Sequence, residues 1–291
     1  MKTTLLAAAL AVCVSTLWAQ QPAQPPAVIQ VGREVIKQGK GAAHRKTEQE
    51  FASALRKAKF PYYYLGLSNE SGPSEVWFLS GFPSFAAMEE GDKLSDKAPL
   101  KTELEMADAH DGELRSDNHS MTAVFRKDLS YLPANGTPLG KTHYMSIDMY
   151  RARLGHGQDV TEGAKQILAA YGKANLSVTV LGYEVVAGAP NGTYLFLAPM
   201  ESLKQMDDTP NNDKALAAAM GAENMQRMEK SEGDVFQTME SFLFSVSPEM
   251  SYLPKEVEDV DPAFWRPKAV ITSAKPSEKS DKTVKTAKAT Q

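Results

Sequence analysis

Histidines are the side chains of this chain that could bind a metal or act as a general base near neutral pH. No two of them lie four residues apart, the spacing with which paired histidines bind zinc from one face of a helix. The sequence therefore predicts no metal site. His119 comes just before a predicted strand and could reach one end of a sheet, although its polar flanks are typical of a surface loop. The five histidines are His44, His110, His119, His143 and His156.

Carboxyl and phenol groups on predicted strands are the other candidates for acid–base chemistry. Residues 144–153 alternate between apolar and polar side chains, which indicates a strand with two different faces. Its polar face carries Asp148 and Tyr150, and a second strand predicted at residues 28–37 carries Glu34 on the corresponding face. With His119, these are the candidate acid–base groups. The two polar faces comprise Gln30, Gly32 and Glu34, and Tyr144, Ser146, Asp148 and Tyr150.

No catalytic motif accompanies these groups, so the sequence assigns no catalytic residue. It contains no Gly-rich phosphate loop, no nucleophile elbow and no recognisable Ser-His-Asp arrangement. Cys13 is the only cysteine, and it lies in an N-terminal segment that we expect to be removed. A chain without Cys13 has no thiol nucleophile, thiolate metal ligand or iron–sulfur cluster.

Residues 1–19 have the pattern of a secretory signal peptide, with Lys2, an apolar run and Ala19 at the expected cleavage site. The run at residues 5–14 is shorter than the roughly 20 residues that span a membrane. A lipoprotein with Cys13 as its first residue is an alternative, but Val12 is not the small residue expected before such a cysteine. We therefore predict a periplasmic or secreted protein that needs no disulfide.

The formal net charge of the chain is −4, and the acidic charge lies mainly in its body. This balance argues against nucleic-acid binding, which requires a basic surface. Residues 274–291 are rich in lysine and poor in apolar residues, so we expect a disordered tail that could contact anionic surfaces.

The order strand, helix, strand, strand, helix, strand is predicted twice. The first copy spans residues 28–133, with strands at 28–37, 62–67, 75–80 and 121–125 and helices at 44–59 and between 84 and 114. The second copy spans residues 141–254, with strands at 144–153, 176–186, 193–198 and 242–246 and helices at 160–171 and 199–228.

A repeated tetrapeptide closes each copy. Ser-Tyr-Leu-Pro occurs at residues 130–133 and again at 251–254, an offset of 121 residues. Gly39 matches Gly155, and Gly66 matches Gly182, both at an offset of 116. The same order of elements with slowly drifting offsets predicts an internal duplication with small insertions in loops.

The element order of each copy is that of a ferredoxin-like unit. Two such units in one chain resemble the dimeric α/β-barrel superfamily in a covalently tandem form, related to antibiotic-biosynthesis-monooxygenase-like and NIPSNAP-like domains. The resemblance covers residues 28–254 and rests on element order. It implies an α+β fold in which two antiparallel sheets pack face to face as an intramolecular α/β barrel. Members that bind haem use a helix-borne histidine, but His119 aligns with Glu240, so we expect neither haem nor another cofactor.

In this fold the polar strand faces are expected to point into the barrel, where they would line a small-molecule pocket. The alternative is an interior that is hydrated or in which these side chains satisfy one another. The candidate ligand-binding residues are Gln30, Glu34, Trp77, His119, Tyr144, Asp148 and Tyr150.

The predicted organisation is completed by a linker at residues 20–27 and a docking segment at 255–273, in which Phe264 and Trp265 pack back on the body. Three functions remain open. The first is binding of a small, partly apolar molecule in the barrel, without nucleic acid or a transmembrane segment. The second is a cofactor-independent monooxygenase-like enzyme, and the third is a structural or interaction protein of the cell envelope.

Overall fold

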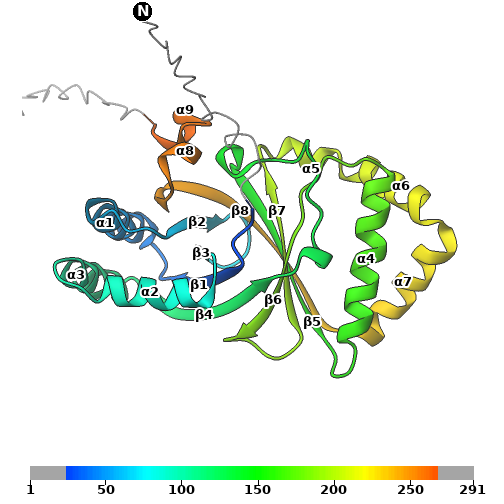
Figure 1. The fold of residues 1–291 in the computed structure, drawn as a ribbon, viewed down its shortest axis with the longest axis horizontal. Helices are drawn as coiled ribbons and strands as arrows, with labels where there is room; N and C mark the ends of the chain where they lie inside the picture. Colours follow the sequence, from blue (N-terminus) through cyan, green and yellow to red (C-terminus); the bar gives the residue numbers. More distant parts are fainter. Residues whose placement is uncertain (1–23, 268–291) are drawn as a thin grey trace, which may run out of the picture.

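Eight antiparallel strands close into one barrel, and helices cover its outer face on two opposite sides (Figure 1). The computed structural model describes residues 24–267. The predicted signal peptide and lysine-rich tail lie outside the described residues. Around the barrel the strands follow the order β1-β3-β2-β8-β5-β7-β6-β4. The α+β class and the barrel are thus as predicted.

The first half of the described chain contributes four strands and three helices. They are β1 (Val28–Ile36), α1 (Gly41–Ala58), β2 (Tyr63–Asn69), β3 (Glu75–Phe82), α2 (Phe85–Ser95), α3 (Leu100–Gly112) and β4 (Arg115–Phe125).

The second half also contributes four strands, followed by two short helices. The elements are β5 (Tyr144–Ala152), α4 (Gly157–Lys173), β6 (Leu181–Ala187), β7 (Thr193–Met200), α5 (Lys204–Asp207), α6 (Thr209–Met220), α7 (Ala222–Val235), β8 (Phe236–Tyr252), α8 (Lys255–Glu258) and α9 (Pro262–Trp265). Helices α1 to α3 lie on one side of the barrel and α4, α6 and α7 on the other (Figure 1). Among the described residues, no helix is both long and apolar enough to cross a membrane.

The two sets of four strands join along their edges. β2 pairs with β8, and β4 pairs with β6, in both cases antiparallel. Because the sheet closes on itself, no strand edge is left unpaired around the barrel.

The interior of the barrel is filled mainly with apolar side chains, and Arg33, which lies over Trp77, pairs there with Glu75 at 3.0 Å. The polar faces predicted on residues 28–37 and 144–153 do not line it, so that prediction is wrong. Met145 and Ile147 of β5 point inward, and Asp148 and Tyr150 point outward toward α4. The predicted alternation of β5 is present, but its apolar face turns into the barrel and its polar face turns toward the helices. A closed barrel excludes water from its interior, so the more apolar face turns inward. The interior side chains include Ile29, Val31, Leu65, Leu67, Trp77, Met121, Ala123, Met145, Ile147, Tyr183, Val185, Leu195, Leu197, Phe244 and Val246.

Contacts of the repeated tetrapeptide connect the two halves of the chain. The Ser130 hydroxyl accepts a hydrogen bond from the backbone N–H of Gly182 at 2.9 Å. The Ser251 hydroxyl accepts one from the backbone N–H of Gly66, also at 2.9 Å. In both cases the first residue of the tetrapeptide in one half binds the backbone of a strand glycine in the other half, and the two glycines are 116 residues apart.

The segment that follows β8 returns to the body of the protein. Trp265 of α9 is 6% exposed and contacts the core, and its Nε1–H donates a hydrogen bond to the Gly140 carbonyl oxygen at 2.8 Å. Phe264 stacks on His143, with ring centroids 3.9 Å apart.

Candidate functional site

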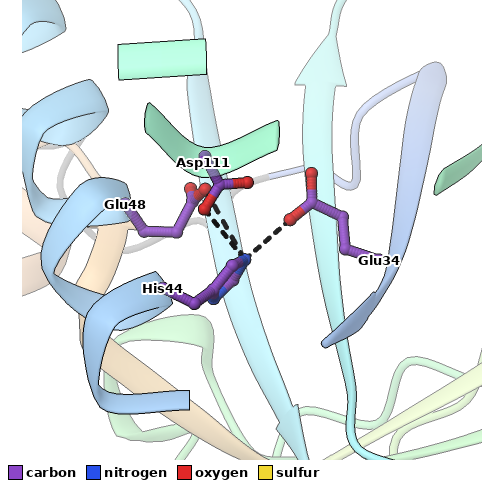
Figure 2. Close-up of side chains that lie close together, drawn as sticks. All are labelled: Glu34, His44, Glu48 and Asp111. Carbon is purple, nitrogen blue, oxygen red and sulfur yellow. Dashed lines mark hydrogen bonds and ion pairs between the residues drawn. The ribbon is translucent and has the colours of Figure 1, made fainter. Parts of the chain in front are cut away.

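A cluster of ionisable side chains is buried between the barrel and the helices of the first half. Glu34 projects from the outer face of β1, His44 and Glu48 project from successive turns of α1, and Asp111 comes from the end of α3 (Figure 2). All four side chains are buried. The positions of His44 and Glu48 follow from helical geometry, because residues four apart share one face. We call these four residues the ionisable cluster.

The imidazole of His44 lies at the centre of the cluster. Its Nε2 is 2.8 Å from Glu34 Oε2, 3.6 Å from Asp111 Oδ1 and 3.8 Å from Glu48 Oε1 (Figure 2). The Thr47 hydroxyl donates a hydrogen bond to Asp111 Oδ1 at 2.7 Å. A single ring nitrogen therefore faces three carboxyl groups.

Arg115, at the start of β4, closes the cluster on one side. Its Nη1 donates to Glu34 Oε1 at 2.6 Å, and its Nε forms an ion pair with Asp111 Oδ2 at 2.9 Å. Asp111 Oδ2 is buried and accepts no well-directed hydrogen bond from the described residues. The guanidinium thus supplies one positive charge to a site with three carboxyl groups.

Burial changes the protonation of the cluster. Desolvation, assisted by the charges of Glu34 and Asp111, raises the pKa of Glu48 to about 9. Desolvation also raises the pKa of Asp111, although the Thr47 hydrogen bond opposes the change. The neighbouring phenol of Tyr64 has a raised pKa for the same reasons, burial first and the charge of Glu48 second. In the absence of a cation, Glu48 is therefore protonated at neutral pH.

The cluster has the composition and spacing of a cation site. One ligand atom from each of its four residues lies within 4.8 Å of all the others. An imidazole nitrogen with several carboxylate oxygens is a ligand set that divalent transition metals accept. The same groups can also simply share protons and hydrogen bonds.

The second half has a cavity where the first half has the ionisable cluster. It has a volume of about 320 Å³ and lies between the outer face of β5 and β7 and helices α4 and α7. Most of its lining is apolar, including Val160, Ala164, Ile167, Leu168, Val178, Val180, Phe196, Met228, Val235, Phe236 and Met239. Only two residues of α4, Val160 and Ala170, are fully buried, because much of its apolar stripe faces this cavity.

A few polar groups interrupt this apolar lining. Tyr150 packs between Phe196 and Phe236, with ring centroids 5.6 and 5.3 Å away. Burial, with the charges of Asp148 and Glu232, raises the pKa of Tyr150 to about 12, so its phenol stays protonated and can donate a hydrogen bond. Asp148 accepts a hydrogen bond from the Ser241 hydroxyl at 2.6 Å. An apolar cavity with a phenol donor and a carboxylate acceptor fits a small, partly apolar molecule.

Comparison with solved structures identifies the fold. A "putative monooxygenase" of Fusobacterium nucleatum subsp. nucleatum aligns with a TM-score of 0.53 and 7% identity, over 77% of this chain and 93% of its own. A mutant chlorite dismutase of Candidatus Nitrospira defluvii aligns with a TM-score of 0.51 and 10% identity, over 83% and 98% of the two chains. An anthrone oxidase-like protein aligns with a TM-score of 0.50 and 12% identity, over 79% and 93%. The fold is that of the dimeric α/β barrels.

At these identities the likeness extends to the fold alone. No protein-family model and no curated protein sequence matches the chain. The function of this protein must therefore be argued from its own side chains.

The predicted site residues are not gathered at one place in the barrel. Trp77 points into the barrel, where it is fully buried against Phe242 and Phe244. His119 is exposed and pairs with Asp117, Nε2 to Oδ2, at 2.9 Å. The other five lie on the outer face of the sheet, where Glu34 joins the ionisable cluster and Asp148 and Tyr150 line the cavity: Gln30, Glu34, Tyr144, Asp148 and Tyr150.

The sequence pattern did not single out His44, Glu48 and Asp111 as members of one site. One signal was present, because a histidine and a glutamate four apart on a predicted helix share one face. The approach of Asp111 depends on how α3 packs against α1, which no local pattern encodes.

Proposed function

We propose that this protein binds a small, partly apolar molecule in the cavity between the β5–β7 face and helices α4 and α7. The observation that carries the proposal is a space of about 320 Å³ with an apolar lining and two polar groups, Asp148 and Tyr150, on one strand. Such a lining gives affinity by burying apolar surface, and its polar groups orient the ligand. The molecule expected from the lining has an aromatic or alicyclic body and a hydroxyl or carbonyl group.

We further propose that the two halves arose by internal duplication. Support comes from reciprocal contacts, since Ser130 holds Gly182 while Ser251 holds Gly66, a glycine 116 positions earlier. A second pair agrees: Tyr131 Oη donates to the Leu176 carbonyl oxygen at 3.0 Å, and Tyr252 Oη donates to that of Phe60 at 2.6 Å. Leu176 and Phe60 are also 116 residues apart.

Under this proposal the cluster and the cavity are two versions of one site. An offset of 116 relates Glu34, His44 and Glu48 to Tyr150, Val160 and Ala164, all of which line the cavity. An offset of 121 relates Asp111 to Glu232, which also lines it. Val160 and Ala164 in the second half are smaller than His44 and Glu48 of the first half, and the space that they leave is part of the cavity.

A fluorescence titration tests the binding proposal. The neutral apolar probe N-phenyl-1-naphthylamine should bind saturably, one molecule per chain. Replacing Gly163 of α4 by Leu should weaken binding by at least ~10-fold, because space is open around the position of its Cβ and the new side chain fills the cavity. The matched control is Ala169→Leu on the exposed face of the same helix. Equal binding by both variants would contradict the proposal.

A second candidate is a cofactor-independent monooxygenase-like activity in the same cavity. It is favoured by a carboxylate beside a half-buried phenol, and by a fold shared with proteins named "putative monooxygenase" and "anthrone oxidase-like protein". In such a reaction Asp148 takes a proton from an activated CH₂ group, and dioxygen converts that carbon to a carbonyl with release of water. Anthrone is the substrate to test with an oxygen electrode. Oxygen uptake that Asp148→Asn abolishes supports an enzyme, whereas binding without uptake supports a carrier or sensor.

We also propose that the chain is exported to the periplasm or secreted, on the basis of the sequence pattern of residues 1–19. The remaining alternative, a structural or interaction protein of the envelope, would be favoured if neither the probe nor anthrone binds.

A further inference from the structure

We propose that Glu34, His44, Glu48 and Asp111 bind one divalent transition-metal cation between β1, α1 and α3. This site is separate from the ligand cavity, which lies on the opposite side of the barrel (Figures 1 and 2).

The ligand atoms have the separations that such a cation requires. Zinc binds imidazole nitrogen and carboxylate oxygen at about 2.0–2.2 Å, so two ligands of a tetrahedral centre lie about 3.3–3.5 Å apart. The distances from His44 Nε2 to the three carboxylate oxygens, 2.8, 3.6 and 3.8 Å, lie on both sides of that value. All four candidate ligand atoms lie within 4.8 Å of one another, so side-chain rotations that draw the carboxylate oxygens together would complete a coordination shell.

The charge of the site also fits a dication. With its carboxyl groups ionised, the cluster carries three negative charges, and Arg115 supplies one positive charge. A neutral His44, the form that binds metals, leaves a formal charge of −2. A divalent cation neutralises this charge without leaving an uncompensated buried carboxylate.

The environment of Glu48 is an independent indication that a partner is missing from the cluster. Its side chain is 7% exposed and points toward His44 and Asp111 (Figure 2), yet no described residue gives it a hydrogen bond. Within the cluster, Asp111 Oδ2 is likewise buried and without a hydrogen-bond partner among the described residues. Native proteins rarely leave buried polar groups in this state. A cation would bind the Glu48 carboxylate directly.

The surroundings indicate a structural ion. Every ligand is buried, and the two elements that carry His44 and Asp111, α1 and α3, pack against each other. A closed shell of four protein ligands is the usual form of structural zinc sites. Metal binding is therefore expected to hold α1 and α3 against β1.

Calorimetric titration of the chelator-treated full chain with Zn²⁺ tests the inference, with Mn²⁺ in parallel. One tight site per chain and a higher melting temperature are expected. Glu48→Gln should weaken binding by at least ~10-fold. It should still fold, because the amide has the shape of the protonated acid. Glu50→Gln, an exposed position two residues further along α1, is the matched control and should bind as tightly as the unaltered chain.

Two further measurements keep the result unambiguous. X-ray absorption of the zinc-loaded chain should show one imidazole and only oxygen ligands otherwise. Replacing His119 and His156, the exposed histidines that face Asp117 and Asp159, should leave the tight site intact. Absence of a one-to-one site, unchanged affinity in Glu48→Gln, or loss of the tight site in the surface-histidine variant would each overturn the inference.

Discussion

At the scale of single residues, Glu48 is expected to make stability depend on pH in the metal-free protein. Its pKa is raised from 4.5 to about 9 by burial first and by Glu34 and Asp111 second. Between these values the folded chain keeps a proton that the unfolded chain releases, so the free energy of unfolding falls as pH rises. The slope approaches about 1.4 kcal/mol per pH unit for one proton. Urea unfolding between pH 5 and about 9, with chelator present, measures it.

The variant Glu48→Gln should remove most of this dependence and be the more stable form near pH 8. Glu50→Gln, on the exposed part of α1, should keep the dependence of the unaltered protein. The same slope in all three proteins would mean that Glu48 does not hold the extra proton.

Trp265 is expected to contribute strongly to the stability of the folded chain. It is buried in the core and donates a hydrogen bond to the Gly140 carbonyl oxygen. Trp265→Ala should lower the free energy of unfolding by roughly 3–5 kcal/mol, whereas Trp265→Phe should lose less, because it keeps an aromatic ring. Equal stability of Trp265→Ala and the unaltered chain, by thermal unfolding, would show that α9 is not anchored to the body.

At the scale of elements, Gly163 lies within α4, where glycine is unfavourable for a helix, and it lines the cavity. A Cβ at Gly163 meets no atom within 4 Å. Gly163→Ala should therefore raise the free energy of unfolding by roughly 0.5–1 kcal/mol, since alanine restricts the unfolded chain and favours the helix. Thermal unfolding measures the gain, and binding of the apolar probe should weaken only slightly. A loss of stability would show that the space at Gly163 is not open.

Most elements could be predicted from local patterns, and the misplaced boundaries have local causes. The pattern of residues 199–228 predicts one helix, but the helix is interrupted at Gly221, whose φ of +84° ends α6 before α7 begins. β4 and β8 begin well before the short apolar stretches at 121–125 and 242–246 that predicted them. Residues 116–120 and 237–241 of these strands are exposed and mostly polar, so they lack the apolar alternation by which strands are recognised.

At the scale of the whole molecule, the barrel could be predicted from element order, but the direction of each strand face could not. The β5 pattern separates Met145 from Asp148 and leaves open which of the two faces is enclosed. Closure decides it, because the barrel interior is packed with mainly apolar side chains and the space under the helices of the second half is not fully packed. The ionisable cluster was missed for a related reason: its ligands come from β1, α1 and α3, and only the assembled fold brings them together.

The close backbone contacts of Gly66 and Gly182 connect the two halves and should be equally sensitive to an added side chain. A Cβ on Gly66 would lie 2.5 Å from the Met250 carbonyl oxygen, and a Cβ on Gly182 would lie 2.3 Å from that of Leu129. Both contacts involve rigid backbone, so Gly66→Ala and Gly182→Ala should each lower the free energy of unfolding by roughly 1–3 kcal/mol. Chemical denaturation of the two variants measures this cost.

The matched control is Gly41→Ala, since a Cβ at Gly41 meets no atom within 4 Å. The two destabilised variants should be similar to each other, because each forces a strand of one half away from the segment just before the repeated tetrapeptide of the other. If only one were destabilised, the halves would not be equivalent across their junctions, and the duplication proposal would lose its structural support. If both were as stable as Gly41→Ala, the close approach itself would be wrong. Comparable losses at both glycines, 116 residues apart, are what two copies of one unit would produce.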